Sequence, residues 1–324
     1  MDEDRPSFLT DAQRSCLINS PDEVTPVSSL VEKKTISDLP GGWLYSEYTK
    51  DKVEILRLLH LVGVSAVLFC YCFAEIWIKY THKFNSSPFA TDILFSNIAW
   101  GAVAFLSGSF IPMAFTESRY SVSFLTEKFI WLFYPTYILL GLMFLSREFK
   151  TQLPGYIISI VSLSCIFILS AFIYYKVRQI NRRYKQTWLQ YISGNAYISI
   201  LFTMSMLDLV RVIVEFVYTN HNDEFSDFLG WKGENWTILL MTLIFGVGMT
   251  MLTMFKDPWC PGVIGFYYLG IYCNQMRYIC RYNKDACSME IQITAITLGL
   301  VAYGFIGVVM VFKKKYSKPI ISTF

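Results

Sequence analysis

Long runs of apolar residues, separated by short polar stretches, dominate the chain after residue 50. A helix crosses the hydrocarbon core of a bilayer with ~20 mainly apolar residues, and eight runs reach about that length. They cover residues 55–78, 92–115, 122–145, 155–175, 190–218, 237–255, 262–280 and 291–312. The runs are too long and too continuously apolar for barrel strands, which alternate over ~10 residues. The pattern therefore predicts an all-α, polytopic transmembrane helical bundle of about eight spans.

Polar residues fill the two ends of the chain. Residues 1–50 mix Pro, Ser, Asp, Glu and Lys and lack the apolar core of a signal peptide, which predicts a disordered N-terminal tail. Residues 51–315 form the predicted transmembrane helical domain, and residues 316–324 form a short C-terminal tail.

Basic residues indicate which loops face the cytoplasm, because short loops rich in Lys and Arg stay on that side. One basic loop, residues 176–185, follows the fourth run, and three lysines at 313–315 follow the eighth. An even number of spans separates these two sites, so both can be cytoplasmic, and counting back places the N-terminus there too. The acidic loop between the fifth and sixth runs then lies outside, whereas basic residues after the seventh run conflict with this scheme.

Two sequons and a group of cysteines fall on the predicted outer side of the membrane. The sequons at Asn85 and Asn235 both fall outside and are candidates for glycosylation, with chance occurrence of a short motif as the alternative. Cys280 and Cys287 flank an outer polar segment, and we expect a disulfide among these two and Cys273 in an oxidising lumen. The sequence thus predicts an integral membrane protein of the secretory pathway or plasma membrane.

The fifth run carries charges deep inside an apolar segment. Asp208 and Arg211 are three residues apart, and Glu215 follows after four more, so the three side chains share one helix face. A charge near the bilayer centre costs ~2.5–3.5 kcal/mol on insertion scales. This face should therefore point into the bundle or into a wet cavity. It is either part of a path for an ion or solute, or a structural ion pair that fixes helix packing.

Small residues form stripes on two other runs. Asn97, Gly101 and Gly108 lie on one face of the second run, and Gly246 lies between two threonines in the sixth. Small side chains let helix backbones approach closely, so we interpret both stripes as helix-packing faces, with a cavity wall as the alternative.

The start of the first run also has polar residues on one face. Glu54, Arg57 and His60 follow one another at spacings of three, near the predicted cytoplasmic interface. Charges at that depth reach the lipid headgroups easily, so we interpret these residues as an interfacial anchor. Residues 256–262 contain two prolines and a glycine and are interpreted as a rigid hairpin between the sixth and seventh runs.

Composition narrows the classes of function. Charged residues make up 16% of the chain, below the quarter usual in soluble proteins, and a net charge of +3 gives no sign of nucleic-acid binding. Three scattered histidines do not provide a haem, di-iron or zinc site, so we expect neither a metal nor a cofactor. No nucleophile elbow or phosphate loop is present, and no catalytic residue is assigned. A lipid transferase that uses acidic residues is a third hypothesis, and its nearest candidate residues are Glu117, Arg119, Glu127 and Lys128.

Two functions fit these patterns better than an enzyme does. The first is a transporter, channel or lipid-moving bundle whose polar path follows the Asp208 face of the fifth run. The alternative is a membrane receptor or adaptor that signals through its cytoplasmic tail and the basic loop 176–185, which would bind anionic lipid headgroups. Transport explains the inward charged stripe directly, whereas a receptor needs that stripe only as structure.

Overall fold

The computed structural model describes residues 50–78, 89–115, 131–146, 153–183, 191–220, 233–280 and 287–316. Throughout these ranges the regular structure is helical, without a β-strand, as the apolar runs predict. The sequon at Asn85, the polar residues 117–128 and nearly all of both predicted tails lie outside the described residues. The second sequon, at Asn235, is exposed in the first turn of a helix.

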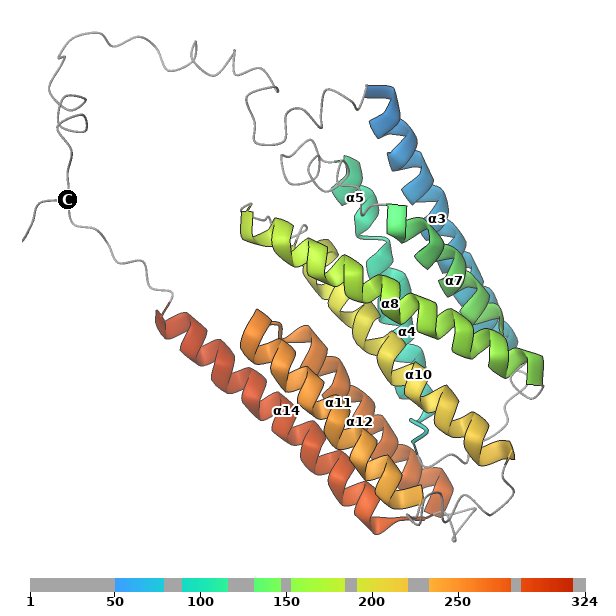
Figure 1. Ribbon diagram of the computed structural model, residues 1–324, viewed down its shortest axis with the longest axis vertical. Coiled ribbons are helices and arrows are strands. Elements are labelled where there is room, and N and C mark those ends of the chain that lie inside the picture. The colour runs from blue at the N-terminus through green and yellow to red at the C-terminus, as the bar shows by residue number, and fades with distance from the viewer. Residues whose placement is uncertain are drawn as a thin grey trace, which may run out of the picture. The chain divides into compact units, whose positions relative to one another are not determined.

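Eight helical segments follow one another in the described ranges, and each overlaps one predicted apolar run (Figure 1). They are α3 (Lys50–Ile78), α4 (Ile93–Ser107) with the short α5 (Phe110–Phe115), α7 (Phe133–Ser146), α8 (Leu153–Arg183), α10 (Ile198–Asn220), α11 (Gly233–Phe255), α12 (Trp259–Asn274) and α14 (Met289–Tyr316). Two π-helical segments extend this set. They are η4 (Ile192–Tyr197), which leads into α10, and η6 (Gln275–Ile279), which follows α12.

Five segments are long and apolar enough to cross a membrane. They are Ile55–Ala74, Ile93–Pro112, Pro154–Gln179, Gly233–Phe255 and Met289–Phe312. α7 is apolar but has only 14 residues, and α10 carries three charged residues. The chain is therefore a membrane-embedded helical protein. The count of eight spans and the cytoplasmic location of both termini stay predictions.

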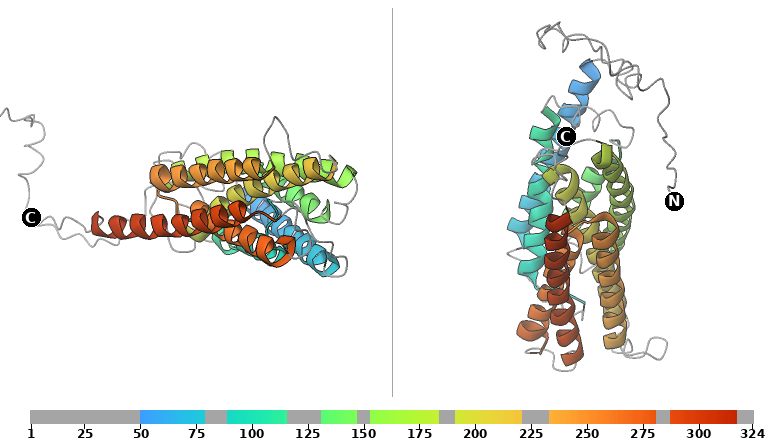
Figure 2. Two further views of the ribbon diagram at one scale, coloured as in Figure 1. Left: turned by 90° about the horizontal axis from the view of Figure 1, so that it is seen from below. Right: turned by 90° about the vertical axis from the view of Figure 1, so that its left-hand side faces the viewer.

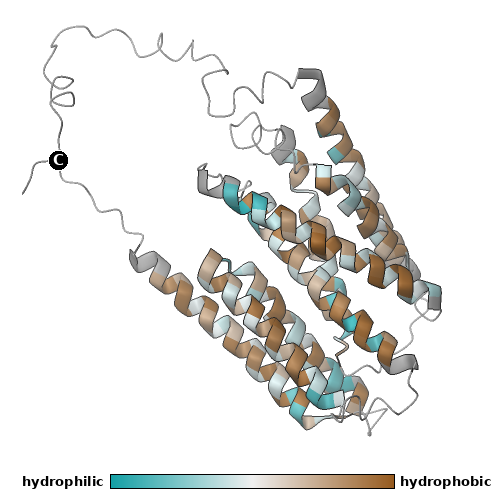
Figure 3. Cartoon of the chain, viewed as in Figure 1, coloured by the Kyte–Doolittle hydropathy of each residue, from teal (hydrophilic) through white to brown (hydrophobic). Residues whose placement is uncertain are grey.

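Apolar side chains cover the outer faces of the helices, and Figure 3 shows apolar residues along most of their length. Phe69, Phe105, Ile138 and Val311 lie on four different helices and are all more than 60% exposed, at 71%, 79%, 66% and 68%. A soluble protein rarely presents apolar surface this widely. Contact with lipid chains accounts for these faces.

α10 is the central helix of the described bundle. Residues 193–208, which include the end of η4, are buried without exception. α10 packs against α8, α12 and α4, while α14 packs against α12 and α11, and α3 packs against α7. Figure 1 shows α10 between α8 and the group of α11, α12 and α14, and Figure 2 shows the same helices from two other directions.

The helices alternate in direction, which gives the bundle two ends (Figure 1). The Arg178 end contains the start of α3, the ends of α8 and α14, and the turn between α11 and α12. The disulfide end contains the start of α4 and the bond between Cys280 and Cys287. The bounds of α8 place Arg178 within the last two turns of that helix.

The segment before α4 lies unusually close to α12. The backbone N–H of Asp92 donates a hydrogen bond to the carbonyl oxygen of Gly270 at 3.0 Å. A Cβ atom at Gly270 would overlap Thr91 Oγ1 and lie 2.8 Å from Phe95 Cβ. Glycine at this position therefore permits the close approach of the two segments.

We expect Gly270→Ala to lower the free energy of unfolding by ~1–3 kcal/mol, because the added methyl group overpacks this contact. Thermal unfolding in detergent measures the effect. Gly246→Ala is the matched control, since a Cβ there meets no described atom within 4 Å. The control should keep or slightly raise the melting temperature. Equal melting temperatures for the two variants would contradict the close approach at Gly270.

Candidate functional site

The charged face of α10 is turned into the bundle. Asp208 is fully buried, and Arg211 is 7% exposed. Arg211 Nε lies 2.7 Å from Asp208 Oδ1, and Arg211 Nη1 lies 3.0 Å from Glu215 Oε2. The guanidinium therefore bridges the two acids, and the spacing of three and four residues brings all three side chains together.

Side chains from two other helices complete this cluster. The indole N–H of Trp100, on α4, donates to Asp208 Oδ2 at 2.5 Å. The hydroxyl of Tyr156, on α8, donates to Glu215 Oε1 at 3.3 Å. A buried charge without such partners costs several kcal/mol, so these contacts allow the charges to stay in the interior. The α10 cluster is defined as Asp208, Arg211, Glu215, Trp100 and Tyr156.

A second buried charge cluster lies at the Arg178 end, and the sequence analysis did not identify it. Asp257, in the turn between α11 and α12, is fully buried, and its Oδ2 lies 2.6 Å from Arg178 Nη2. The same oxygen accepts hydrogen bonds from the hydroxyls of Tyr174 at 2.9 Å and Ser199 at 2.6 Å. Arg178 Nη1 also donates to Asn195 Oδ1 at 2.8 Å. These five residues form the Asp257 cluster.

Local backbone structure holds the Asp257 cluster on both sides. Lys256 has a φ of 52°, which is uncommon for a residue with a side chain. The N–H of Trp259 donates to Asp257 Oδ1 at 3.0 Å, so both carboxylate oxygens have donors. On the opposite side, Asn195 belongs to η4, and π-helical turns occur frequently at functional sites. The predicted hairpin is thus also the element that carries a buried acid.

The position of Arg178 corrects one interpretation of the basic loop 176–185. The basic loop, Arg178 included, was predicted to face lipid headgroups, whereas the structure pairs Arg178 with Asp257 inside the bundle. α8 continues to Arg183, beyond the end of the predicted run, so the face that carries Tyr174 still points toward α10 at Arg178. Lys176, on another face, is exposed. Headgroup binding by the rest of this loop stays a prediction.

His60 was interpreted as part of an interfacial anchor, and this is wrong because His60 is buried and 2% exposed. Its Nδ1 lies 3.2 Å from the Tyr137 hydroxyl oxygen. The rings of Phe110, Phe133 and Tyr134 surround it, with centroid distances of 6.4, 5.8 and 5.2 Å. These rings come from helices distant in sequence, so a spacing rule along the first run cannot show that they are nearby.

The two small-residue stripes differ in whether another helix packs against them. A Cβ at Gly101 would lie 2.8 Å from the hydroxyl oxygen of Tyr71, so this glycine packs closely on α3. The same hydroxyl donates to the carbonyl oxygen of Asn97 at 3.0 Å. Gly108 lies in the turn between α4 and α5, while Gly246 is exposed on α11. The structure therefore places Asn97 and Gly101, but not Gly246, against another described helix.

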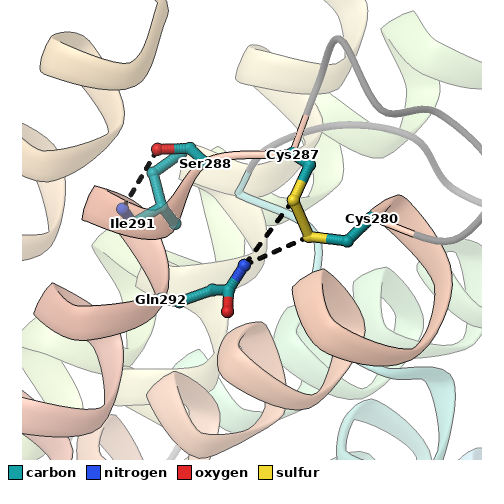
Figure 4. Close-up of a disulfide and its surroundings, with 5 residues drawn as sticks. All are labelled: Cys280, Cys287, Ser288, Ile291 and Gln292. Carbon is teal, nitrogen blue, oxygen red and sulfur yellow. Dashed lines mark hydrogen bonds between the residues drawn. A yellow bond between two sulfur atoms is a disulfide. The ribbon is translucent and has the colours of Figure 1, made fainter.

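Cys280 and Cys287 form a disulfide that links the end of η6 to the start of α14 (Figure 4). The side-chain amide of Gln292 donates to Cys280 Sγ at 3.1 Å, and Ser288 Oγ caps the first turn of α14. Cys273 is a free cysteine. A disulfide at this end fits the predicted outer location, since such bonds persist in oxidising compartments.

Buried polar groups occur along the whole length of η4 and α10. Asn195 and Glu215 are twenty residues apart, which corresponds to ~30 Å of helix and so to the thickness of a bilayer core. Between them, Thr203 is buried, and Ser205 Oγ lies 3.5 Å from Ser170 Oγ on α8. The two charge clusters therefore lie toward opposite ends of one buried helical segment, η4 followed by α10.

Among the described residues, no group of three or more His, Cys, Asp or Glu is arranged to hold a metal ion. Comparison of the chain with protein-family models, curated proteins and solved structures gave no match. Function therefore has to be inferred from the two charge clusters and from the helices that they join.

We expect Asp257→Asn to lower the free energy of unfolding by ~3–5 kcal/mol, because it leaves the Arg178 charge buried without its counterion. Thermal unfolding in detergent measures this loss. The double variant Arg178→Met/Asp257→Leu removes both charges and should regain part of the stability. Glu290→Gln, at an exposed acid of α14, is the matched control. A loss of similar size in the control would contradict the role of the Asp257 cluster.

We expect the double variant Cys280→Ser/Cys287→Ser to be less stable by ~2–3 kcal/mol, since the bond restricts a short loop in the unfolded chain. Cys273→Ser, which removes a free thiol, should leave stability unchanged. Melting curves with and without reductant provide the measurement. If reductant lowers the melting temperature of the double variant as much as that of the wild type, the disulfide is not the cause.

Proposed function

We propose that the chain is a membrane transport protein, a channel, carrier or lipid-moving bundle, whose path follows the inward face of α10. The observation that carries the proposal is the burial of a charged helix at the centre of the bundle. Asp208 and Arg211 lie in the interior of the bundle, and further buried polar groups occur along η4 and α10 over about the depth of a bilayer. Ionisable residues inside membrane helices mark pathways and relays by default.

Stability alone is a poor explanation for these charges. A buried ion pair replaced by well-packed apolar side chains is often equally stable or more stable. The chain nevertheless carries two such clusters, with Arg211 between two acids in one and Arg178 beside Asp257 in the other. Ion pairs that break and re-form during transport would explain why the protein has buried charges in place of apolar side chains.

The two clusters share α8 but otherwise join α10 to different elements, which supports a mechanism that opens one end at a time. The α10 cluster connects α10 to α4 and α8, through Trp100 and Tyr156. The Asp257 cluster connects α10 to α8 and to the turn between α11 and α12, through Ser199 and Arg178. Opening of the Asp257 cluster alone would expose the α10 face from the Arg178 end. Loss of the Trp100 and Tyr156 contacts, with the three charges still paired on α10, would expose it from the disulfide end.

We expect Asp208→Asn to reduce flux in proteoliposomes to the level of protein-free vesicles. The variant removes the charge but keeps an oxygen for Trp100, and Arg211 stays paired with Glu215. Flux is followed with potassium, protons and a fluorescent phospholipid as three separate probes. Melting temperature is measured in parallel, so that unfolding is recognised. Glu290→Gln is the matched carboxylate control and should transport like the wild type.

Thiol labelling tests the path without an identified substrate. Met204→Cys, fully buried and one helical turn before Asp208, should react with a small aqueous thiol reagent in a background that keeps only the disulfide cysteines. Ile213→Cys, at a lipid-facing position that is 42% exposed, is the control and should not react. If no probe is transported and Met204→Cys stays unlabelled from both sides, the proposal is wrong. A dry structural ion pair, in a receptor or adaptor, would then explain α10.

A further inference from the structure

An apolar groove lies between α4, α12 and α14, and α10 forms part of its floor. Its volume is about 440 Å³, within the range of sites that hold small ligands. The lining is almost entirely apolar. Residues from all four helices contribute to it, among them Ala102 of α4, Ile200 of α10, Gly262 of α12 and Ile306 of α14.

Small side chains create the space in the groove. A Cβ at Gly262 would meet Ile306 Cδ1 at 3.7 Å, an ordinary contact, so helix packing does not require glycine there. The hydroxyl of Tyr303 donates to the carbonyl oxygen of Gly262 at 3.1 Å. Trp259 and Tyr303 are 36% and 40% exposed, and they form part of the rim. The groove is thus open at the side. The carbonyl oxygen of Gly262, on its lining, already accepts a hydrogen bond from Tyr303.

The groove belongs to the apolar belt of the protein. α4 and α14, which form two of its walls, contribute the candidate spans Ile93–Pro112 and Met289–Phe312. Apolar cavities do not hold water well, because water needs two to four polar partners. The apolar molecule that a bilayer supplies at this position is a lipid chain.

A positively charged side chain lies near one end of the groove. Pro258 and Trp259 line that end and directly follow the turn that carries Lys256. Lys256 is exposed and forms no ion pair with any residue in the described ranges. Its neighbour Asp257 is neutralised by Arg178. The turn therefore presents a net positive charge, which attracts phosphate, beside an indole of the kind found at headgroup level.

We infer that this groove binds one acyl chain of a phospholipid, whose phosphate lies at Lys256. The inference deepens the proposed function and rests on it in naming phospholipid as the substrate class. Ile200 in the groove floor is adjacent in sequence to Ser199 of the Asp257 cluster, so a bound chain would touch the helix that carries the path.

Photo-crosslinking tests the site in the full-length protein reconstituted into phosphatidylcholine vesicles. The probe is phosphatidylglycerol with a photoactivatable group in one acyl chain, and mass spectrometry locates the crosslinked residues. The wild type should give crosslinks in residues 98–102 and 259–266. Gly262→Leu fills the groove and should lose them. Gly304→Leu, on α14 where a Cβ meets no described atom within 4 Å, should keep them.

Two further variants keep the test decisive. Ala102→Leu fills the groove from the α4 wall and should have the same effect if Gly262→Leu does not fold. Lys256→Gln should reduce the preference for phosphatidylglycerol over phosphatidylcholine ~5-fold, as expected for one lost interfacial charge. Crosslinks that persist in both folded groove variants would overturn the inference. Crosslinks between two copies of the chain at these residues would overturn it as well.

Failure of this inference is distinguishable from failure of the proposed function. Asp208→Asn lies outside the groove and should keep the crosslinks while flux is lost. Flux of the fluorescent phospholipid that continues in folded Gly262→Leu contradicts the groove as the substrate site and leaves the path intact. Crosslinks in the wild type without flux of any probe contradict transport and leave the lipid site intact.

Discussion

The pairing of Arg211 with Asp208 and Glu215 is the constraint on which the arrangement of the bundle depends. Three charges on one helix are too costly to face lipid, so α10 has to lie where other helices can cover and hydrogen-bond them. α4 supplies the indole of Trp100, and α8 supplies the hydroxyl of Tyr156. The central position of α10 follows from this requirement, while the remaining helices present apolar faces outward.

Much of this architecture could be predicted from the sequence, because it depends on local pattern. Apolar length located the helical segments, and spacings of three and four placed Asp208, Arg211 and Glu215 on one face. The Asp257 cluster could not be found in this way, since Arg178 and Asp257 each look like part of a polar loop. Their pairing depends on the continuation of α8 and on the fold of a distant turn. The burial of His60 could not be predicted for the same reason, because its aromatic neighbours lie on α5 and α7.

The two clusters differ in how they are built, and this difference bears on the transport that we propose. The α10 cluster gathers three of its members from one helix, so its charges stay close whatever the neighbouring helices do. The Asp257 cluster joins an acid in a turn to a cation on α8, so helix movement can separate them. A bundle that carries both has one cluster that retains its charges and another that can divide. The first suits a site that a substrate passes, and the second suits a gate.

The disulfide gives the α12–α14 pair a mechanical asymmetry. Cys280 and Cys287 tie the two helices covalently at one end, whereas α14 at the other end continues to Tyr316 without such a tie among the described residues. Relative motion of the two helices is therefore restricted at this end and can grow with distance from the covalent link. The apolar groove and the turn that carries Lys256 and Asp257 lie toward the other end of the pair, away from the disulfide. A small rotation of the two helices about the disulfide end would thus change the width of the groove, and the position of the charged turn, more than it moves the disulfide itself.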